Sequence, residues 1–79
     1  ETHPSVTVAP VTSTIVDAPL FRLTVEPSPG NGLRRVSQIM VDKVTTVPRT
    51  RLGRRIGSLD GADLLRLNRG LMVFLGLAG

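Results

Sequence analysis

Short, mostly apolar segments alternate with polar connections along the chain until its C-terminal part, where apolar residues recur at helical spacing. The first such segment, residues 6–15, is rich in β-branched residues and has no charged residue, which predicts a buried or half-buried strand. Because Pro10 has no N–H to donate to a ladder, the strand must be bulged or lie at an edge there. Three consecutive hydroxyls, Thr12, Ser13 and Thr14, come where the strand gives way to a loop. They either satisfy backbone groups at the strand end or stand at the rim of a sheet, where a ligand could meet them.

Four further segments have the pattern of strands: residues 20–25, 36–41, 44–47 and 53–57. In the first of these, apolar and polar side chains alternate, so Phe21, Leu23 and Val25 share the face that we assign to the core. Asp42 directly follows the second segment. Between the two, residues 27–32 are rich in proline and glycine, which predicts a loop.

The C-terminal segment is predicted to form one long helix that begins at Asp60, a favourable N-cap residue. Asp63 adds a carboxylate in the first turn, where the helix dipole favours negative charge. Gly70 lies in the middle of the helix, which indicates close packing by a neighbouring element, and Gly76 suits a C-cap. One apolar stripe should pack on the sheet, formed by Leu64, Leu67, Leu71, Phe74 and Leu75. Antiparallel strands followed by a single helix are typical of the α+β class.

The length of 79 residues predicts a single small domain over the whole chain. A core of this size gives marginal stability, and the absence of cysteine excludes disulfides and thiolate metal sites, so oligomerisation is the remaining common source of stability. The sequence contains no apolar run long enough to span a membrane and no recognisable signal peptide, so we expect a cytoplasmic protein.

Basic residues are concentrated after position 33, where nine of the ten lie, eight of them arginine. Guanidinium groups bind phosphate and carboxylate in a bidentate manner, which favours a polyanionic partner such as nucleic acid or an acidic peptide. A solvated basic surface is the alternative. The chain has only two aromatic residues, Phe21 and Phe74, so it is poorly supplied for stacking on single-stranded bases.

The chain lacks the residues that most catalytic mechanisms need. It has no cysteine nucleophile, a single histidine near the N-terminus, no acidic or histidine metal cluster and no glycine-rich phosphate loop. Hydroxyls, a mid-chain carboxylate and arginines remain. Phosphodiester chemistry can use this set without a metal ion, because an arginine stabilises charge on the phosphorane and a ribose 2′-hydroxyl can be the nucleophile. Cleavage of that kind is restricted to RNA.

Three segments resemble the MazF/PemK toxins in their order and spacing: residues 8–15, 36–42 and 46–57. Residues 63–77 are similar to the C-terminal helix of that family. The resemblance covers nearly the whole chain from Val6 onward. It implies a small SH3-like antiparallel β-barrel or sheet with one C-terminal α-helix, working as a homodimer.

The same resemblance implies a function. Members of the family are mostly metal-independent, sequence-specific endoribonucleases that cleave single-stranded RNA, without a cofactor, and so halt translation. Each is neutralised by an antitoxin whose extended, acidic C-terminal tail covers the RNA groove. The chain is accordingly expected to be the toxin of a toxin–antitoxin system.

The resemblance also assigns residues. The strand-end threonine that helps to hold the scissile phosphate corresponds to Thr12. Asp42 stands where some relatives have an aspartate that assists substrate binding or proton transfer, although those relatives carry an arginine where this chain has Met40. A strand-end aspartate also commonly caps a turn, which is the alternative for Asp42. The candidate contacts to RNA or antitoxin are Ser13, Thr14, Arg49, Arg51, Arg54 and Arg55.

One part of the family pattern has no counterpart, namely an N-terminal part with two strands and an Arg-Pro loop that carries the principal catalytic arginine. We therefore expect an N-terminally incomplete toxin domain whose first strand is covered by another segment or by a partner subunit. Two alternatives stay open. One is a CcdB-like gyrase poison of the same fold, although Leu75 stands before Gly76 where that family has an aromatic residue. The other is an inactive, truncated toxin that only binds antitoxin.

Overall fold

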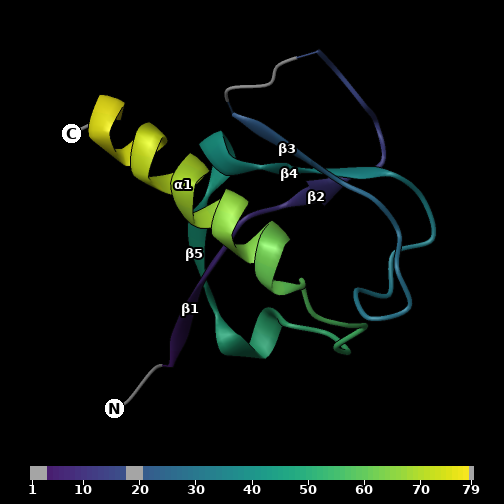
Figure 1. The fold of residues 1–79 in the computed structure, drawn as a ribbon. Coiled ribbons are helices and arrows are strands. Elements are labelled where there is room, and N and C mark those ends of the chain that lie inside the picture. The colour runs from purple at the N-terminus through teal and green to yellow at the C-terminus, as the bar shows by residue number, and fades with distance from the viewer. Residues whose placement is uncertain (1–3, 18–20, 79) are drawn as a thin grey trace.

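The computed structural model describes residues 4–17 and 21–78 and contains five strands, two short 3-10 helices and one α-helix (Figure 1). In chain order they are β1 (Ser5–Val8), β2 (Val11–Thr12), β3 (Arg22–Val25), β4 (Ser37–Met40), η1 (Val41–Lys43), β5 (Thr45–Pro48), η2 (Arg49–Arg51) and α1 (Gly61–Ala78). The predicted α+β class with a single C-terminal helix is confirmed.

The strands of the described residues form two antiparallel sheets rather than one continuous ladder. β1 pairs with β5, and β4 lies between β2 and β3 in the second sheet. The predicted first strand therefore divides at Ala9 and Pro10, and its two halves join different sheets. Pro10 still accepts a hydrogen bond from the N–H of Met40 at 2.8 Å, which its own missing N–H does not prevent. At Pro10, where the sequence predicts a bulge or an edge position within one strand, the strand instead ends and the chain changes sheets.

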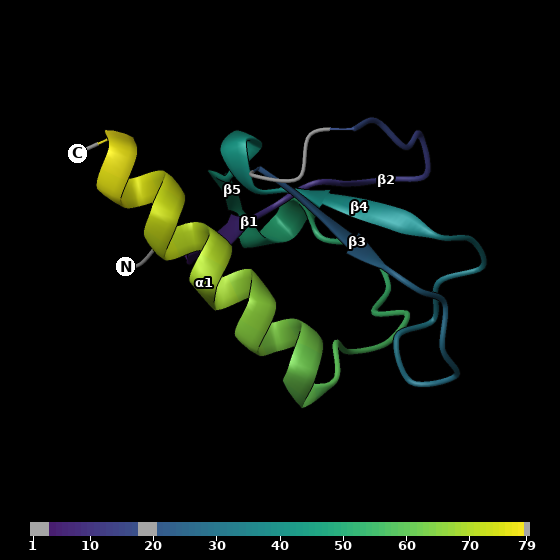
Figure 2. The ribbon, with the colours of Figure 1, turned by 45° about the horizontal axis from the view of Figure 1, so that its top comes forward.

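The core lies between the three-stranded sheet and α1, which packs against β3 and η1 and runs alongside β3 (Figure 2). Its buried members are Val25, Ile39 and Val41, with 1%, 5% and 2% of their surface exposed. The predicted alternation in β3 is confirmed, because Leu23 and Val25 face this core. Gly70 is also where close packing occurs, since a Cβ atom there would lie 3.6 Å from a methyl group of Val41.

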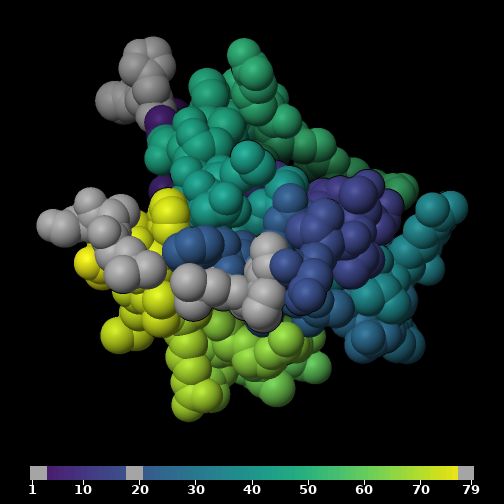
Figure 3. Space-filling view, turned by 90° about the horizontal axis from the view of Figure 1, so that it is seen from above, coloured from purple at the N-terminus to yellow at the C-terminus, as the bar shows by residue number. Residues whose placement is uncertain are grey.

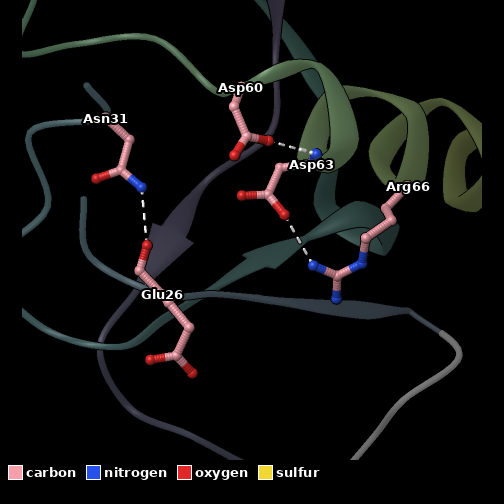
Figure 4. A network of polar contacts seen from close by, with 5 residues as sticks. All are labelled: Glu26, Asn31, Asp60, Asp63 and Arg66. Atoms are coloured by element: carbon pink, nitrogen blue, oxygen red, sulfur yellow. Dashed lines mark hydrogen bonds and ion pairs between the residues drawn. The ribbon is translucent and has the colours of Figure 1, made fainter. Parts of the chain in front are cut away.

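The helix begins as predicted, but its C-terminal end and the extent of its buried apolar stripe differ from the prediction. Asp60 caps it by accepting a hydrogen bond from the N–H of Asp63 at 2.8 Å (Figure 4). Gly76 does not end the helix, which continues to Ala78. Leu64 and Leu75 are 48% and 57% exposed and do not pack on the core. The remaining stripe residues pack on the core: Leu67, Leu71 and Phe74.

The prediction of a strand at residues 53–57 is wrong. This segment pairs with no strand of the described residues; it lies against the loop at residues 28–32. The N–H of Ser58 donates to the carbonyl of Gly30 at 2.9 Å. Gly57 is so close to Asn31 that an added Cβ would clash with the carbonyl group of that residue. A loop thus takes the place of the expected ladder partner.

Asn31 organises this loop from a buried position. Its Oδ1 accepts hydrogen bonds from the N–H groups of Ser28 and Leu33 at 3.0 and 2.9 Å. Its Nδ2 donates to the carbonyl of Glu26 at 2.8 Å (Figure 4). Next to it, Gly32 has a φ of 71°, a conformation that glycine adopts at no steric cost. The loop predicted from its glycines and prolines is therefore fixed by a buried side chain.

Candidate RNA-binding face

The register of the three-stranded sheet places a row of polar side chains across its outer face. Thr12 of β2 and Thr24 of β3 both lie opposite Gln38 of β4. Arg22 lies opposite Met40 in the next row. Because directly paired residues of antiparallel strands point to the same side, these five side chains share the face opposite the core. We call this surface the polar face.

Thr12 has a hydroxyl on the polar face that is available for a ligand. Its side chain is half-exposed, and its Oγ1 accepts a hydrogen bond from the N–H of Thr14 at 3.1 Å. This bond fixes the oxygen and leaves the hydroxyl proton to point elsewhere. No acceptor among the described residues takes that proton. The hydroxyl can therefore donate to an oxygen atom of a bound phosphate. Ser13 and Thr14 follow it in exposed positions.

Gln38 lies in the middle of the polar face with only 4% of its surface exposed. Its Oε1 accepts from the N–H of Val16 at 3.1 Å, and its Nε2 donates to the carbonyl of the same residue at 2.9 Å. Two further bonds join the amide to Arg22 Nη1 and to Thr24 Oγ1, both at 3.3 Å. Residues 12–16 consequently fold back over the sheet, and Figure 3 shows this segment, in violet, at the molecular surface.

A hollow of about 660 Å³ opens beside this segment, between the edge of β3 and the first half of α1. It brings Arg66 and Arg69 of the helix to the same side of the molecule as Arg22. Arg66 is paired with Asp63 at 2.9 Å (Figure 4), and Asp17 also lines the hollow. The positive charge of the hollow is therefore partly balanced by carboxylates.

The structure does not bring the two predicted catalytic residues together. Thr12 lies opposite Gln38, whereas Asp42 follows Met40 in η1, past the other end of β4. Met40 lies two residue steps, or roughly 7 Å, along β4 from Gln38, and the chain then turns to Asp42. Asp42 is exposed. A common role in one site would need a ligand long enough to reach both, such as a strand of several nucleotides.

The predicted basic contacts fall into two groups, all of them exposed. Arg49 and Arg51 lie in η2, where the N–H of Arg49 donates to the carbonyl of Pro4 at 3.0 Å. Arg54 and Arg55 line a second hollow of about 610 Å³ together with Arg34. The guanidinium of Arg55 is bonded to the hydroxyl of Ser58 and to the carbonyl of Gly57, so it also holds its own loop.

Sequence reasoning did not single out Gln38, Arg22 or Arg34 as members of these surfaces. A glutamine inside an otherwise apolar strand is itself a signal, because a buried amide needs hydrogen-bond partners. The alternation that assigned Leu23 and Val25 to the core also implies that Arg22 faces the other way. Arg34 carried no local signal beyond the excess of arginine.

Metal-binding clusters and membrane-spanning helices are both absent from the part of the chain that the structure describes. No group of three or more histidine, cysteine, aspartate or glutamate side chains among those residues could hold a metal ion. No helix in the same part of the chain is both long enough and apolar enough to cross a membrane.

Comparison with known proteins gives matches over most of the chain. Residues 1–75 match the family described as PemK-like, MazF-like toxin of type II toxin–antitoxin system. The chain is 55% identical over 75 residues to a probable endoribonuclease MazF of Mycolicibacterium smegmatis, and the alignment covers 95% of this chain and 69% of that protein.

Two solved structures have the same fold. The Mycobacterium tuberculosis toxin MazF-mt6 superposes with a TM-score of 0.78 at 30% identity, covering 91% of this chain and 70% of its own. A second Mtb toxin gives a TM-score of 0.76 at 33% identity, covering 89% of this chain and 74% of its own.

Proposed function

Because the chain belongs to the family of PemK-like, MazF-like toxins of type II toxin–antitoxin systems, we propose that it acts as an endoribonuclease that cleaves messenger RNA at specific sequences. The reaction needs no metal ion and stops translation in the cytoplasm. The observation that supports this most is the hydroxyl of Thr12, fixed by the N–H of Thr14 and free to donate from the polar face.

In the proposed reaction the 2′-hydroxyl of the substrate attacks the adjacent phosphorus atom. The bond from phosphorus to the 5′-oxygen breaks, which leaves a 2′,3′-cyclic phosphate and a 5′-hydroxyl end. Thr12 donates to a non-bridging phosphate oxygen, whose negative charge increases as the phosphorane forms.

The partners follow from the same premise. A type II toxin has an antitoxin partner, and we propose that an acidic C-terminal tail of that antitoxin competes with RNA for the exposed arginines. We further propose a homodimer. The exposed apolar side chains of α1, such as Leu65 and Met72, support a protein contact on the helix. Ser13, Thr14 and Asp42 remain proposed contacts to RNA.

A direct test is incubation of the purified protein as encoded with a defined RNA in excess chelator. We expect new RNA ends that carry 2′,3′-cyclic phosphate, at a limited set of sequences. Failure to produce such ends, or production only after Mg²⁺ is added, would contradict the proposal. The same RNA with a 2′-deoxyribose at the cleaved position is the control, because it lacks the nucleophile and must stay intact.

The basic hollow gives a separate prediction. Changing Arg34 and Arg54 together to glutamine should weaken RNA binding and reduce the dependence of log Kd on log salt by roughly 0.7 for each phosphate that is no longer neutralised. Both side chains line the hollow and are exposed, so the fold should tolerate the change. RNA binding measured over a range of salt concentrations checks this. Changing Arg35 and Lys43 together to glutamine is the matched control, because both are exposed and neither lines either hollow; an equal effect of the two double changes would contradict a role of this hollow.

A further inference from the structure

We propose that Gln38 is a positioning residue for RNA cleavage, because its buried amide holds residues 12–16 in the conformation that presents the Thr12 hydroxyl. The inference rests on the proposed function. Gln38 lies directly opposite Thr12 in the ladder. The same residue therefore pairs with the threonine in the sheet and binds the chain four residues later, at Val16.

The side-chain amide of Gln38 bonds to Val16 in the way that the backbone of a paired strand residue would. The amide accepts from the N–H and donates to the carbonyl of Val16, at 3.1 and 2.9 Å. A further hydrogen bond, within residues 12–16, runs from the N–H of Thr14 to Thr12 Oγ1. The amide of Gln38 is itself fixed from the opposite side by Arg22 and Thr24. An amide that makes these four bonds has one orientation, so the segment it binds has one as well.

This arrangement differs from ordinary core packing. Val16 is exposed, so apolar burial contributes little to keeping it against the sheet. The segment depends on the glutamine instead. Loss of the amide should release Val16 and let the Thr12 hydroxyl move, and displacement of a catalytic group by about 1 Å can cost on the order of 100-fold in rate.

The test compares two substitutions in the protein as encoded. Gln38→Met keeps the length of the side chain and removes all four hydrogen bonds. Gln38→Glu keeps the acceptor bonds when ionised but cannot donate to Val16 or Thr24. Ile39→Val, on the same strand but on the core face, is the matched control for a general loss of stability.

The hydrogen-exchange rate of the Val16 amide tests the structural half of the inference, namely that Gln38 holds Val16 against the sheet. The β1 amides of the other sheet are the internal reference. Q38M should speed exchange at Val16 by roughly 10- to 30-fold relative to β1, the factor expected for two hydrogen bonds of ordinary net strength. Q38E should fall between Q38M and wild type, and I39V should change both sites alike. If Q38M does not fold, Q38E carries the same comparison.

The single-turnover rate of cleavage at saturating RNA tests the catalytic half, namely that Gln38 positions the Thr12 hydroxyl. Q38M should slow it by about 10- to 100-fold, with a much smaller change in RNA affinity because the arginines are intact. A rate equal to wild type with a released Val16 would overturn the inference, and so would unchanged exchange at Val16. Absence of cleavage by the wild type would overturn the proposed function and the catalytic half together, while the exchange at Val16 would still decide the structural half.

Discussion

The variant Thr12→Val should cleave RNA roughly 100- to 1,000-fold more slowly than the wild type at saturating substrate, the cost typical of removing one donor to a developing oxyanion. Valine has the shape of threonine without the hydroxyl, so the chain loses the donor and the acceptor for the N–H of Thr14 but little packing. Because Thr12 is half-exposed, the free energy of unfolding should change little. Single-turnover kinetics and urea unfolding of the same preparation measure both quantities.

Thr12→Ser is the control for this prediction, because serine restores the hydroxyl without the methyl group. Its rate should lie close to that of the wild type. If the valine variant cleaves as fast as the serine variant, the hydroxyl has no part in the reaction and the polar face is not the site.

The largest expected effect on stability comes from Gly32→Ala, which should lower the free energy of unfolding by about 3 kcal/mol. The φ of 71° at Gly32 strains any residue with a Cβ, and the added atom would clash with the carbonyl oxygen of Ile56. Backbone at both sides must move to admit it. Urea unfolding measures the loss.

Gly30→Ala is the matched control within the same loop. A Cβ there would have only the hydroxyl oxygen of Ser28 nearby, at 3.9 Å, so its stability should stay close to that of the wild type. Equal stabilities of the two variants would contradict the close contact between the loop at residues 28–32 and the segment that carries Arg54 and Arg55.

The local sequence pattern was sufficient to predict β3 and the start of α1. The alternation of β3 identified Leu23 and Val25 as core residues, and Asp60 was identified as the N-cap of the helix. Proline chemistry indicated a bulge or an edge position at Pro10, but not that the strand divides there and its two halves join different sheets. Such a change of sheet depends on which strands pair, and residues far apart in the sequence decide that.

The same limit explains the misses. Residues 53–57 were predicted to be a short strand bracketed by glycines, but they lie against a loop held by Asn31. The apolar stripe of α1 was predicted to pack on the sheet along its whole length, yet Leu64 and Leu75 are largely exposed and outside the core. Gly76 has the sequence signature of a C-cap, whereas the helix passes through it.

At the candidate site, sequence reasoning found the hydroxyls but not what fixes them. The amide of Gln38 meets Val16 only because β2 and β4 pair in one particular register. The pattern also placed Thr12 and Asp42 each at a strand end. It did not show that the two residues lie near opposite ends of β4.

The most direct measurement of the central claim is a structure of the protein as encoded with an RNA whose nucleophilic 2′-hydroxyl is replaced by hydrogen. We predict a non-bridging oxygen of the scissile phosphate at about 2.7 Å from Thr12 Oγ1, with the RNA lying across the polar face of the three-stranded sheet. A scissile phosphate bound elsewhere, with no contact to Thr12, would contradict the account.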